Sequence, residues 1–378
     1  MQHDFDRLIA RQGSQSLKWQ KYAGRDILPL WVADMDFAAP PAVIEALRTR
    51  VEHGIYGYTL PPPELVTVIA DSLWRDYRWS IEPDWLVWLP GLVTGLNVAC
   101  RAVGEPGSAV LSQTPVYPPF LSAPGLSGRR LVKVPLSLDK GRWQLDMDAL
   151  EAAATEDCRL LLLCNPQNPT GRVFSRGELD QLAEFCLRHD LTVCSDEIHC
   201  DLILDPVCRH RPLAGLDDAI AARTITLMAP SKTYNLPGLG CSFAIISDPS
   251  LRRRFQRVME GIVPHVTLFG YAGALAAYRD SGPWLTDLLA YLRENRRRVT
   301  GAVAAMEDLE MTPVEATYLA WIDARLLPVT DPAAFFEQAG VGLSDGADFG
   351  TPGFVRLNFG CPRSRLDAAL ERMVKALS

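Results

Sequence analysis

The sequence has none of the segments that mark secreted or membrane proteins. Its first six residues carry neither the basic cluster nor the apolar stretch of a signal peptide. No uninterrupted apolar run approaches the roughly 20 residues that a bilayer-spanning helix needs. The nine cysteines are scattered and include no Cys-x-x-Cys pair, a pattern typical of reduced thiols inside a cell. We therefore expect a cytoplasmic protein with no membrane partner.

Strong positive charge and metal-ligand spacing are also missing. The net charge is −7. The two arginine triplets, at 252–254 and 296–298, lie in helical-looking stretches with acidic neighbours, which predicts solvated faces rather than a nucleic-acid interface. The six histidines show no spacing typical of metal ligands. We expect neither a nucleic-acid partner nor a bound metal.

What the sequence does contain is enough apolar material for a large core. It has 378 residues, of which 48% are hydrophobic, and this length suggests two domains. Short apolar runs alternate with amphipathic helical stretches such as 96–103 and 177–189. Unbroken apolar strands separated by helices predict an α/β fold with a mostly parallel sheet covered on both faces. Ligands of such sheets bind beyond the carboxyl ends of the strands. We expect strands at 86–89, 108–112, 131–134, 160–164, 191–194, 225–228 and 243–246.

A different pattern begins near residue 284 and predicts a smaller α+β unit. The N-terminal segment has a strand-like stretch at 28–32 but too little other structure to form a unit by itself. We therefore expect it to pack on the small unit or at an interface. The predicted division is an N-terminal segment 1–40, a large domain 41–284 and a small domain 285–378. In the small unit we expect helices at 284–306, 332–339 and 365–376 and strands at 317–323 and 354–359.

Four polar residues stand at the ends of apolar strands or within them. Asn168 follows one strand in a turn forced by two Asn-Pro pairs and a glycine. Asp196 directly follows the next strand, and Lys232 follows a later one among small and polar residues. Arg356 alternates with apolar residues within the last expected strand. An inward arginine at such a position must find an anion, because an unpaired buried charge is very costly.

These residue types fit the chemistry of pyridoxal 5'-phosphate (PLP). Burial makes a lysine amine lose its proton more easily, so Lys232 can form a Schiff base with an aldehyde and shuttle an α-proton. A buried carboxylate such as Asp196 keeps the pyridine nitrogen protonated. Asn168 can donate to the phenolic oxygen, and Arg356 can bind the carboxylate of an amino-acid substrate with two parallel hydrogen bonds.

Each of these residues has a simpler explanation when it is taken alone. Lys232 could be a solvated surface charge, and Asn168 could cap a turn. Asp196 could cap a helix, and Arg356 could pair with an internal carboxylate. All four in this order favour the PLP site over four separate structural roles.

The same order of motifs resembles a known superfamily. The run Asn-Pro-x-Asn-Pro-Thr-Gly, a strand aspartate, Ser-Lys and an arginine near the C-terminus are similar to the fold-type I PLP enzymes of the class I/II aminotransferase superfamily. The run Leu-Pro-Leu-Trp-Val-Ala-Asp-Met-Asp-Phe at 28–37 resembles the signature of the MalY/PatB group of cystathionine β-lyases. The segments 54–59, 195–202 and 356–364 match the same group, so the similarity runs from end to end.

The resemblance implies a PLP-dependent transferase fold of type I, with a seven-stranded sheet in the large domain and active sites at the interface of a homodimer. It also implies roles for further residues. Tyr117 would stack on the pyridine ring and belong with Lys232 and Asp196 to the catalytic set. Tyr58 would reach the phosphate and substrate of the neighbouring subunit, and the backbone of Ala33 would approach the substrate carboxylate. The remaining cofactor ligands would be Val93 and Thr94 at a helix N-terminus, Ser231 and His199.

Simpler roles remain open for these residues too. Tyr117 and Tyr58 could be core or interface aromatics, and His199 could be a structural hydrogen-bonding residue. The sequence also departs from the wider superfamily at two positions. Gly240 stands where many members carry a phosphate-binding arginine, and Ala229 stands where many carry a serine. We therefore expect phosphate binding to depend on the helix N-terminus, Ser231 and Tyr58.

The resemblance implies β-elimination at an amino acid that carries a sulfur leaving group on Cβ. The products would be a thiol, pyruvate and ammonia, and the substrate a small amino-acid thioether such as cystathionine. Two alternatives remain open at this point. One is an aminotransferase on the same scaffold, and the other, less favoured, is a PLP-binding regulatory protein with little activity.

Overall fold

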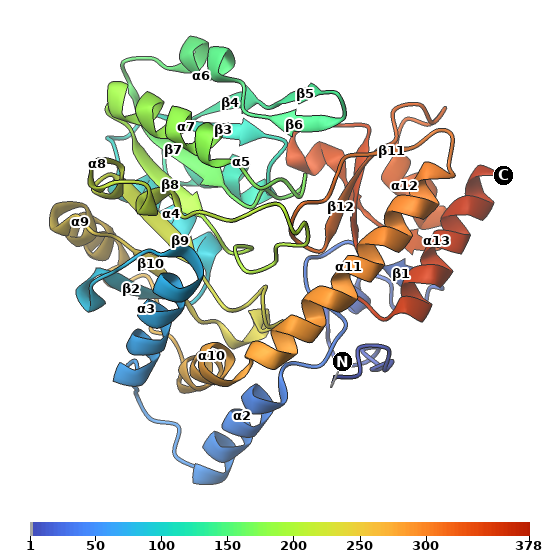
Figure 1. The fold of residues 1–378 in the computed structure, drawn as a ribbon, viewed down its shortest axis with the longest axis horizontal. Helices are drawn as coiled ribbons and strands as arrows, with labels where there is room; N and C mark the ends of the chain where they lie inside the picture. The colour runs from blue at the N-terminus through green and yellow to red at the C-terminus, as the bar shows by residue number, and fades with distance from the viewer. Residues whose placement is uncertain (1–2) are drawn as a thin grey trace.

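A seven-stranded sheet forms the larger part of the molecule (Figure 1). The computed structural model describes residues 3–378. The strands lie in the order β2-β10-β9-β8-β7-β3-β4, and β10 runs antiparallel to both of its neighbours while the others pair in parallel. The predicted mostly parallel sheet is confirmed. Its strands are β2 (Leu86–Leu89), β3 (Ala109–Thr114), β4 (Arg130–Pro135), β7 (Cys158–Cys164), β8 (Thr192–Asp196), β9 (Thr224–Met228) and β10 (Ser242–Ile245).

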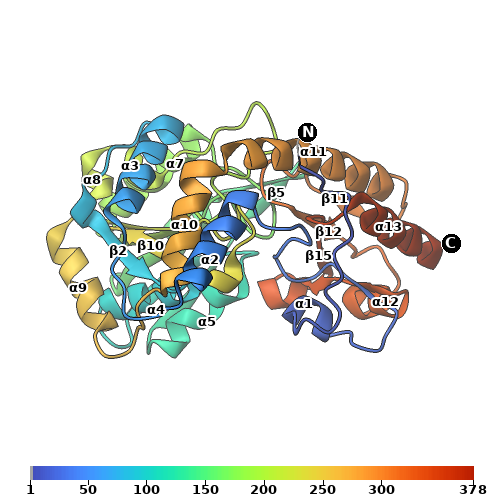
Figure 2. The same cartoon turned by 90° about the horizontal axis from the view of Figure 1, so that it is seen from below.

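Helices cover both faces of this sheet, which explains why its strands are apolar without a break. In β7, Leu160 and Leu162 face the core under α4, α5 and α9, whereas Leu161 and Leu163 face the core under α6, α7 and α8. Figure 2 shows α4 and α5 on one side and α7 and α8 on the other. The bounds are α4 (Leu92–Ala102), α5 (Pro118–Leu126), α6 (Met147–Ala153), α7 (Arg176–Arg188), α8 (Asp218–Ala221) and α9 (Pro249–Met259).

Three more helices and a hairpin complete this part of the fold. Helices α3 (Pro63–Tyr77) and α10 (Leu268–Asp280) cover the edge formed by β2 and β10, and α2 (Pro41–His53) packs against α10. Strands β5 (Ser137–Asp139) and β6 (Arg142–Gln144) form the hairpin. No helix of residues 3–378 is long and apolar enough to cross a membrane.

A long helix, α11 (Gly282–Ala304), leads from α10 into a second, antiparallel sheet (Figure 1). This sheet has the order β11-β12-β15-β14, and α11 and α13 pack against each other beside it. The elements are β11 (Glu310–Met311), β12 (Leu319–Asp323), β14 (Ser344–Asp345), β15 (Phe354–Asn358), α12 (Pro332–Gln338) and α13 (Arg363–Leu377). β12 begins two residues later than expected because Thr317 has a positive φ of 74°, which strands do not adopt.

The N-terminal residues pack on this second unit. Helix α1 (Leu17–Gln20) precedes β1 (Leu28–Pro29), and β1 pairs in parallel with β13 (Val341–Gly342). Phe5, Leu30 and Phe37 belong to the same core as α11, β12 and α13. The strand expected at 28–32 ends at Pro29. Leu30 still bonds to main-chain atoms of Gly342 and Asn358, but the main-chain oxygens of Trp31 and Val32 accept from side chains instead of a neighbouring strand. The division at residues 40 and 284 stays a prediction.

Candidate active site

One cavity of about 470 Å³ opens at the carboxyl ends of the central strands. Strands β9, β8 and β7 are neighbours in the sheet, so the residues that follow them meet at one edge. Two of the predicted residues lie apart from the cavity: Thr94 lines a neighbouring hollow, and Tyr58 is fully exposed. The predicted residues that line the cavity are Ala33, Val93, Tyr117, Asn168, Asp196, His199, Ser231, Lys232 and Arg356.

Lys232 lies in the turn after β9 and directs its amine into this cavity. Its Nζ donates a hydrogen bond to the main-chain oxygen of Ala33, 2.5 Å away. Burial, together with the positive charge of Arg356 and against the opposing effect of Asp34 and Asp196, lowers the pKa of this amine to about 8. A lysine with this pKa has a substantial neutral fraction near neutral pH, and the neutral amine is the nucleophile and the base.

Asp196, at the end of β8, is a buried carboxylate, only 5% exposed. Its Oδ1 accepts a hydrogen bond from the amide of Ile198 at 3.1 Å. Burial raises its pKa to about 7, and the hydrogen bond and the charge of Lys232 only partly oppose this. No ion pair joins it to a cation among residues 3–378. A protonated ring nitrogen placed against Asp196 would supply that cation, so the residue fits the pyridine end of PLP.

Arg356 reaches the cavity from β15 in the second sheet, and it is 4% exposed. Its Nη1 donates to Oδ1 of Asn168 at 2.8 Å, and its Nη2 donates to the main-chain oxygen of Trp31 at 2.7 Å. Its Nε has no hydrogen-bond partner, and no carboxylate pairs with it in the described chain. Burial lowers its pKa to about 10, so it remains a cation at neutral pH. A substrate carboxylate is the anion that this position lacks.

Asn168 and Tyr117 lie beside this arginine. The side-chain oxygen of Asn168 is used by Arg356 rather than by the turn backbone, and this leaves its NH₂ group for a phenolic oxygen. The amide of Tyr117, at the start of α5, donates to the main-chain oxygen of Asn168 at 3.0 Å. Burial raises the pKa of the Tyr117 hydroxyl, so this group stays protonated. The stacking role of Tyr117 stays a prediction.

His199 lies deeper in the cavity wall and is almost fully buried. Its Nδ1 has no hydrogen-bond partner among the described residues, and its ring meets that of Tyr318 edge to face with centroids 6.0 Å apart. Burial lowers its pKa well below the usual value, and the nearby charges of Lys232 and Arg356 act in the same direction. The histidine is therefore neutral, and its unpartnered nitrogen is available to a ligand.

The first turn of α4 supplies a site for the phosphate. Gly91 is the N-cap residue, and no side chain of residues 3–378 caps this helix, so the amides of Leu92 and Val93, which line the cavity, have N–H groups free for a phosphate. Gly240 has a φ of 64°, and a Cβ added there would approach the main-chain oxygen of Pro90 to 3.3 Å. Glycine therefore suits position 240, where the main chain comes close to that of Pro90, better than the arginine of other family members would.

The segment from Trp31 to Phe37 lines the cavity through its first three residues, and side chains from three distant parts of the chain hold this segment. The oxygen of Ala33 accepts from the hydroxyl of Tyr318 at 2.9 Å as well as from Lys232. Nδ2 of Asn358 donates to the oxygens of Val32 and Asp34 at 2.6 and 2.7 Å. The site thus depends on main-chain oxygens that are fixed by buried side chains.

Sequence reasoning missed these supporting residues. Asn235 bonds to the backbone of Met35 and Phe37 through both of its amide atoms. The position of Asn358, two residues after Arg356 on the same face of a strand, is a signal that could have found it. Tyr318 carries no comparable signal, because nothing in its local sequence places its hydroxyl near Ala33.

A buried ion cluster anchors the same segment. The carboxylate of Asp36 pairs with Lys18 at 3.1 Å, Arg11 at 2.7 Å and Arg365 at 2.9 Å. Burial by itself raises the pKa of Asp36, but Lys18, Arg365 and Arg11 reverse this and lower it overall. Asp36 therefore stays ionised, and four charges fix the segment to the N-terminal residues and to α13.

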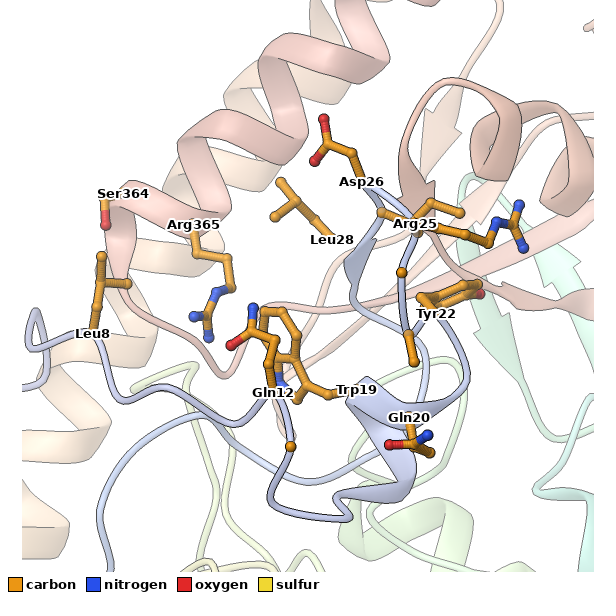
Figure 3. A pocket seen from close by; sticks show the side chains of 14 residues that line it. Leu8, Gln12, Trp19, Gln20, Tyr22, Arg25, Asp26, Leu28, Ser364 and Arg365 are labelled. Atoms are coloured by element: carbon orange, nitrogen blue, oxygen red, sulfur yellow. The ribbon is translucent and has the colours of Figure 1, made fainter.

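A larger cavity, about 630 Å³, lies elsewhere, between residues 8–28 and the start of α13 (Figure 3). Arg365 points toward Trp19 there, with its guanidinium carbon 4.5 Å from the ring centroid. None of the described residues that line this cavity is a lysine, cysteine or histidine. It therefore offers no amine for a Schiff base with PLP, so the smaller cavity, which holds Lys232, is the candidate active site.

The fold and the site together define a class of protein. A mostly parallel seven-stranded sheet presents an asparagine, an aspartate and a lysine at adjacent strand ends, and a second sheet supplies an arginine. This is the arrangement of the fold-type I PLP-dependent enzymes, as the sequence predicted. The chain belongs to the family Aminotransferase class I and II, which it matches over residues 25–373.

Relatives and solved structures agree with this assignment. The chain is 37% identical to "Cystathionine beta-lyase PatB" of Bacillus subtilis, over 99% of this chain and all of that protein. It matches the crystal structure of OvoB with a TM-score of 0.97 and 50% identity, over 100% of this chain and 99% of that one. It also matches cystalysin from Treponema denticola, a structure that contains PLP, with a TM-score of 0.95 and 34% identity over 100% and 99%.

Proposed function

We propose that this protein is a PLP-dependent carbon–sulfur lyase that acts on an L-amino acid with a sulfur leaving group on Cβ. The observation that carries the assignment to a PLP-dependent enzyme of amino acids is the buried Arg356, which has no carboxylate partner in the described chain and faces the same cavity as Lys232 and Asp196. Relatives named cystathionine β-lyase support the type of reaction.

Different residues of this chain bind the substrate, bind the cofactor and transfer the protons. Arg356 and the backbone near Ala33 hold the α-carboxylate of the substrate, and this orients the α-hydrogen for removal. Asp196 keeps a proton on the pyridine nitrogen, and Asn168 donates to the phenolic oxygen. When bound, PLP withdraws electrons from the substrate's α-carbon and so stabilises the negative charge left by proton loss.

Lys232 moves the protons. Its neutral Nζ takes the α-proton, and the resulting electron pair forms a double bond to Cβ as the C–S bond breaks. The sulfur leaves with the electrons of that bond and takes up a proton to become a thiol. Hydrolysis of the remaining enamine consumes one water molecule and gives pyruvate and ammonia.

An aminotransferase needs the same Lys232, Asp196 and Arg356, so these residues do not separate the two reactions. The difference lies in whether the negative charge expels a leaving group or is reprotonated on the cofactor. Relatives named cystathionine β-lyase favour the lyase, although less similar relatives are named as transaminases. A regulatory protein is less favoured, because such a protein has no need for a proton-shuttling lysine beside a carboxylate site.

The proposal predicts pyruvate release from L-cystathionine, L-cystine or S-alkyl-L-cysteines by the PLP-loaded protein. A coupled lactate dehydrogenase assay measures it, and L-alanine, which has no leaving group, is the matched negative control. No pyruvate from any of these substrates would contradict the lyase. Accumulation of pyridoxamine phosphate, with a 2-oxo acid required for further turnover, would establish the aminotransferase instead.

We further propose that the protein is a homodimer in which Tyr58 completes the partner's active site. The connection between α2 and α3 exposes the apolar side chains of Ile55 and Leu60, and Tyr58 extends fully into solvent between them. A monomer gains nothing from exposing such a segment, whereas a second copy would cover it. The cytoplasmic location stays a prediction from the cysteine pattern.

Replacing Tyr58 by phenylalanine should weaken PLP binding about tenfold, because one hydrogen bond to a charged phosphate is lost. The matched control is Tyr56→Phe, since the Tyr56 hydroxyl donates to Val51 of its own chain. Spectroscopic PLP titration measures the difference.

A dimer assembled from one Tyr58→Phe subunit and one Lys232→Ala subunit should recover one intact site, because Lys232 of the first subunit and Tyr58 of the second would meet in it. A monomer in sedimentation, or equal PLP affinity of both tyrosine variants, would contradict the shared site.

A further inference from the structure

The larger cavity, beside the start of α13, contains a buried cation that donates no hydrogen bond from its side chain. The side chain of Arg365 is only 9% exposed and points into this space of about 630 Å³ (Figure 3). Its Nη1 forms an ion pair with Oδ2 of Asp36 at 2.9 Å but no hydrogen bond within residues 3–378. A guanidinium carries five N–H donors, and a buried donor without an acceptor is costly. Arg365 therefore needs an acceptor that the described chain does not provide.

The charges around this arginine do not balance. Three cations pair with Asp36, namely Arg365, Lys18 and Arg11. Asp34 is the other carboxylate of this cluster in the described chain, and it pairs with two of the same cations. Three positive charges thus share two negative ones, and burial makes an uncompensated charge expensive. The cluster is one anion short.

The other charged side chains that line the cavity already have partners. Arg25 pairs with Glu337 at 2.8 Å, and Asp26 pairs with Arg372 at 2.9 Å. These two pairs are neutral, so they leave the positive charge of Arg365 uncompensated in the described lining. The cavity therefore favours a negatively charged ligand.

The N-terminus of α13 adds a second group that binds anions. Pro362 is the N-cap residue, and no side chain of residues 3–378 caps this helix. Ser364 lines the cavity, and its amide has no hydrogen-bond partner in the described chain. A free amide in the first turn of a helix lies at the positive end of the helix dipole and binds oxyanions. Arg365 follows in the same turn, so both groups are available to one anion.

The rest of the wall fits an organic molecule rather than a bare ion. The volume of about 630 Å³ is typical of sites for small organic ligands. Apolar side chains contribute much of the wall, namely Leu8, Ile27, Leu28 and Trp19. No described residue lines both this cavity and the candidate active site. A molecule bound here is therefore separate from the amino acid that reacts at Lys232.

We propose that this cavity is a second ligand site, for a small organic molecule that carries an oxyanion, either a phosphate monoester or a carboxylate. Arg365 and the amide of Ser364 bind the oxyanion, and the organic part lies against Trp19 and its apolar neighbours. The bound anion supplies the negative charge that the cluster around Asp36 lacks. This proposal goes beyond the lyase function and does not depend on it.

Isothermal titration calorimetry of the PLP-loaded protein tests the site with phenyl phosphate, benzoate, inorganic phosphate and phenol. PLP fills the phosphate site proposed at the start of α4, so an added phosphate has to bind elsewhere. At least one of the two aromatic anions should bind at one molecule per chain and about tenfold or more tightly than phenol, because only an anion satisfies Arg365. The tighter of the two identifies the oxyanion. Phenyl phosphate should also bind more tightly than inorganic phosphate if the ligand is a phosphate monoester, because it adds contacts with the apolar wall.

Substitutions at Gln12 test where the anion binds. Gln12 is exposed in the cavity wall, and its side chain makes no hydrogen bond within residues 3–378, so the fold should tolerate its replacement. Gln12→Glu should weaken binding of the tighter anion about fivefold, and Gln12→Lys should strengthen it by a similar factor, the size expected for one exposed charge. The matched controls are Gln181→Glu and Gln181→Lys in α7, an exposed position outside this cavity, and they should leave the affinity unchanged.

Arg365→Gln should weaken the same binding about tenfold or more, because it removes the cation itself. A normal thermal unfolding curve shows that this variant is folded. The absence of saturable binding of both aromatic anions to the wild-type protein would overturn the site. Equal affinities of the wild-type protein and the two Gln12 variants would also overturn it, because the anion would then lie elsewhere, for example at Arg356.

Discussion

Replacing Lys232 by alanine is expected to lower pyruvate release by about 10⁴-fold or more. The change removes both the amine that holds the cofactor and the base that takes the α-proton, and acid–base catalysis alone contributes about 10²–10⁴-fold. The same variant should lose the absorbance near the visible edge that marks a lysine-bound PLP. Absorbance spectra and single-turnover assays measure the two effects separately.

A matched control for this variant is Lys140→Ala, because Lys140 is an exposed lysine in the turn between β5 and β6. It should keep both the absorbance and the activity. Should Lys232→Ala retain the lysine-bound absorbance, another amine would hold the cofactor, and the assignment of Lys232 would be wrong. A normal thermal unfolding curve of the variant separates loss of chemistry from loss of fold.

The second large effect is expected at Arg356. Truncating one partner of a buried charge pair costs about 2–5 kcal/mol, so Arg356→Gln should lower kcat/KM by about 30- to 5,000-fold. The loss should appear mainly as a higher KM for the amino acid. PLP binding should change little, since Lys232, Asp196 and the N-terminus of α4 remain. Steady-state kinetics and a PLP titration of the same preparation test both parts.

Ser344→Ala provides the control for Arg356. It removes a single hydrogen-bond acceptor of the guanidinium, at 3.3 Å, and leaves the charge in place, so its kcat/KM should fall by less than about tenfold. If Arg356→Gln and Ser344→Ala have equal effects, the charge of Arg356 does not bind the substrate. If only the PLP affinity falls, Arg356 serves the cofactor and the proposed carboxylate site is wrong.

Much of the large sheet was predictable, because each buried strand is a short apolar run between helices that alternate in the sequence. Helix α10 was not predicted from the sequence. It packs against α2, α3 and α11, so it is apolar on most of its surface and lacks the polar face that marks a helix. Two of its glycines, Gly270 and Gly273, allow close approach to Leu239, which only the packed structure explains.

The candidate site was predictable for the residues whose position follows from strand order. Asp196 and Lys232 come at or just after the ends of adjacent parallel strands, and local sequence fixes that placement. Asn235 and Tyr318 were not predictable, because their hydrogen bonds to Met35 and Ala33 span 200 and 285 residues of sequence. Tyr58 and Thr94 lie outside the cavity of the single chain, and their roles stay predictions.

The sequence by itself determined the chemistry of this protein: the buried strands, the polar residues at their ends, and the resemblance that the family match confirms. Only the tertiary structure decided how these groups are tuned and enclosed. The hydrogen bond from Lys232 to Ala33 spans 199 residues, and that from Tyr318 to Ala33 spans 285. The shifted pKa values of Lys232 and Asp196 arise mainly from burial. Both depend on which distant segments pack around the site, and no local pattern of residues contains that information.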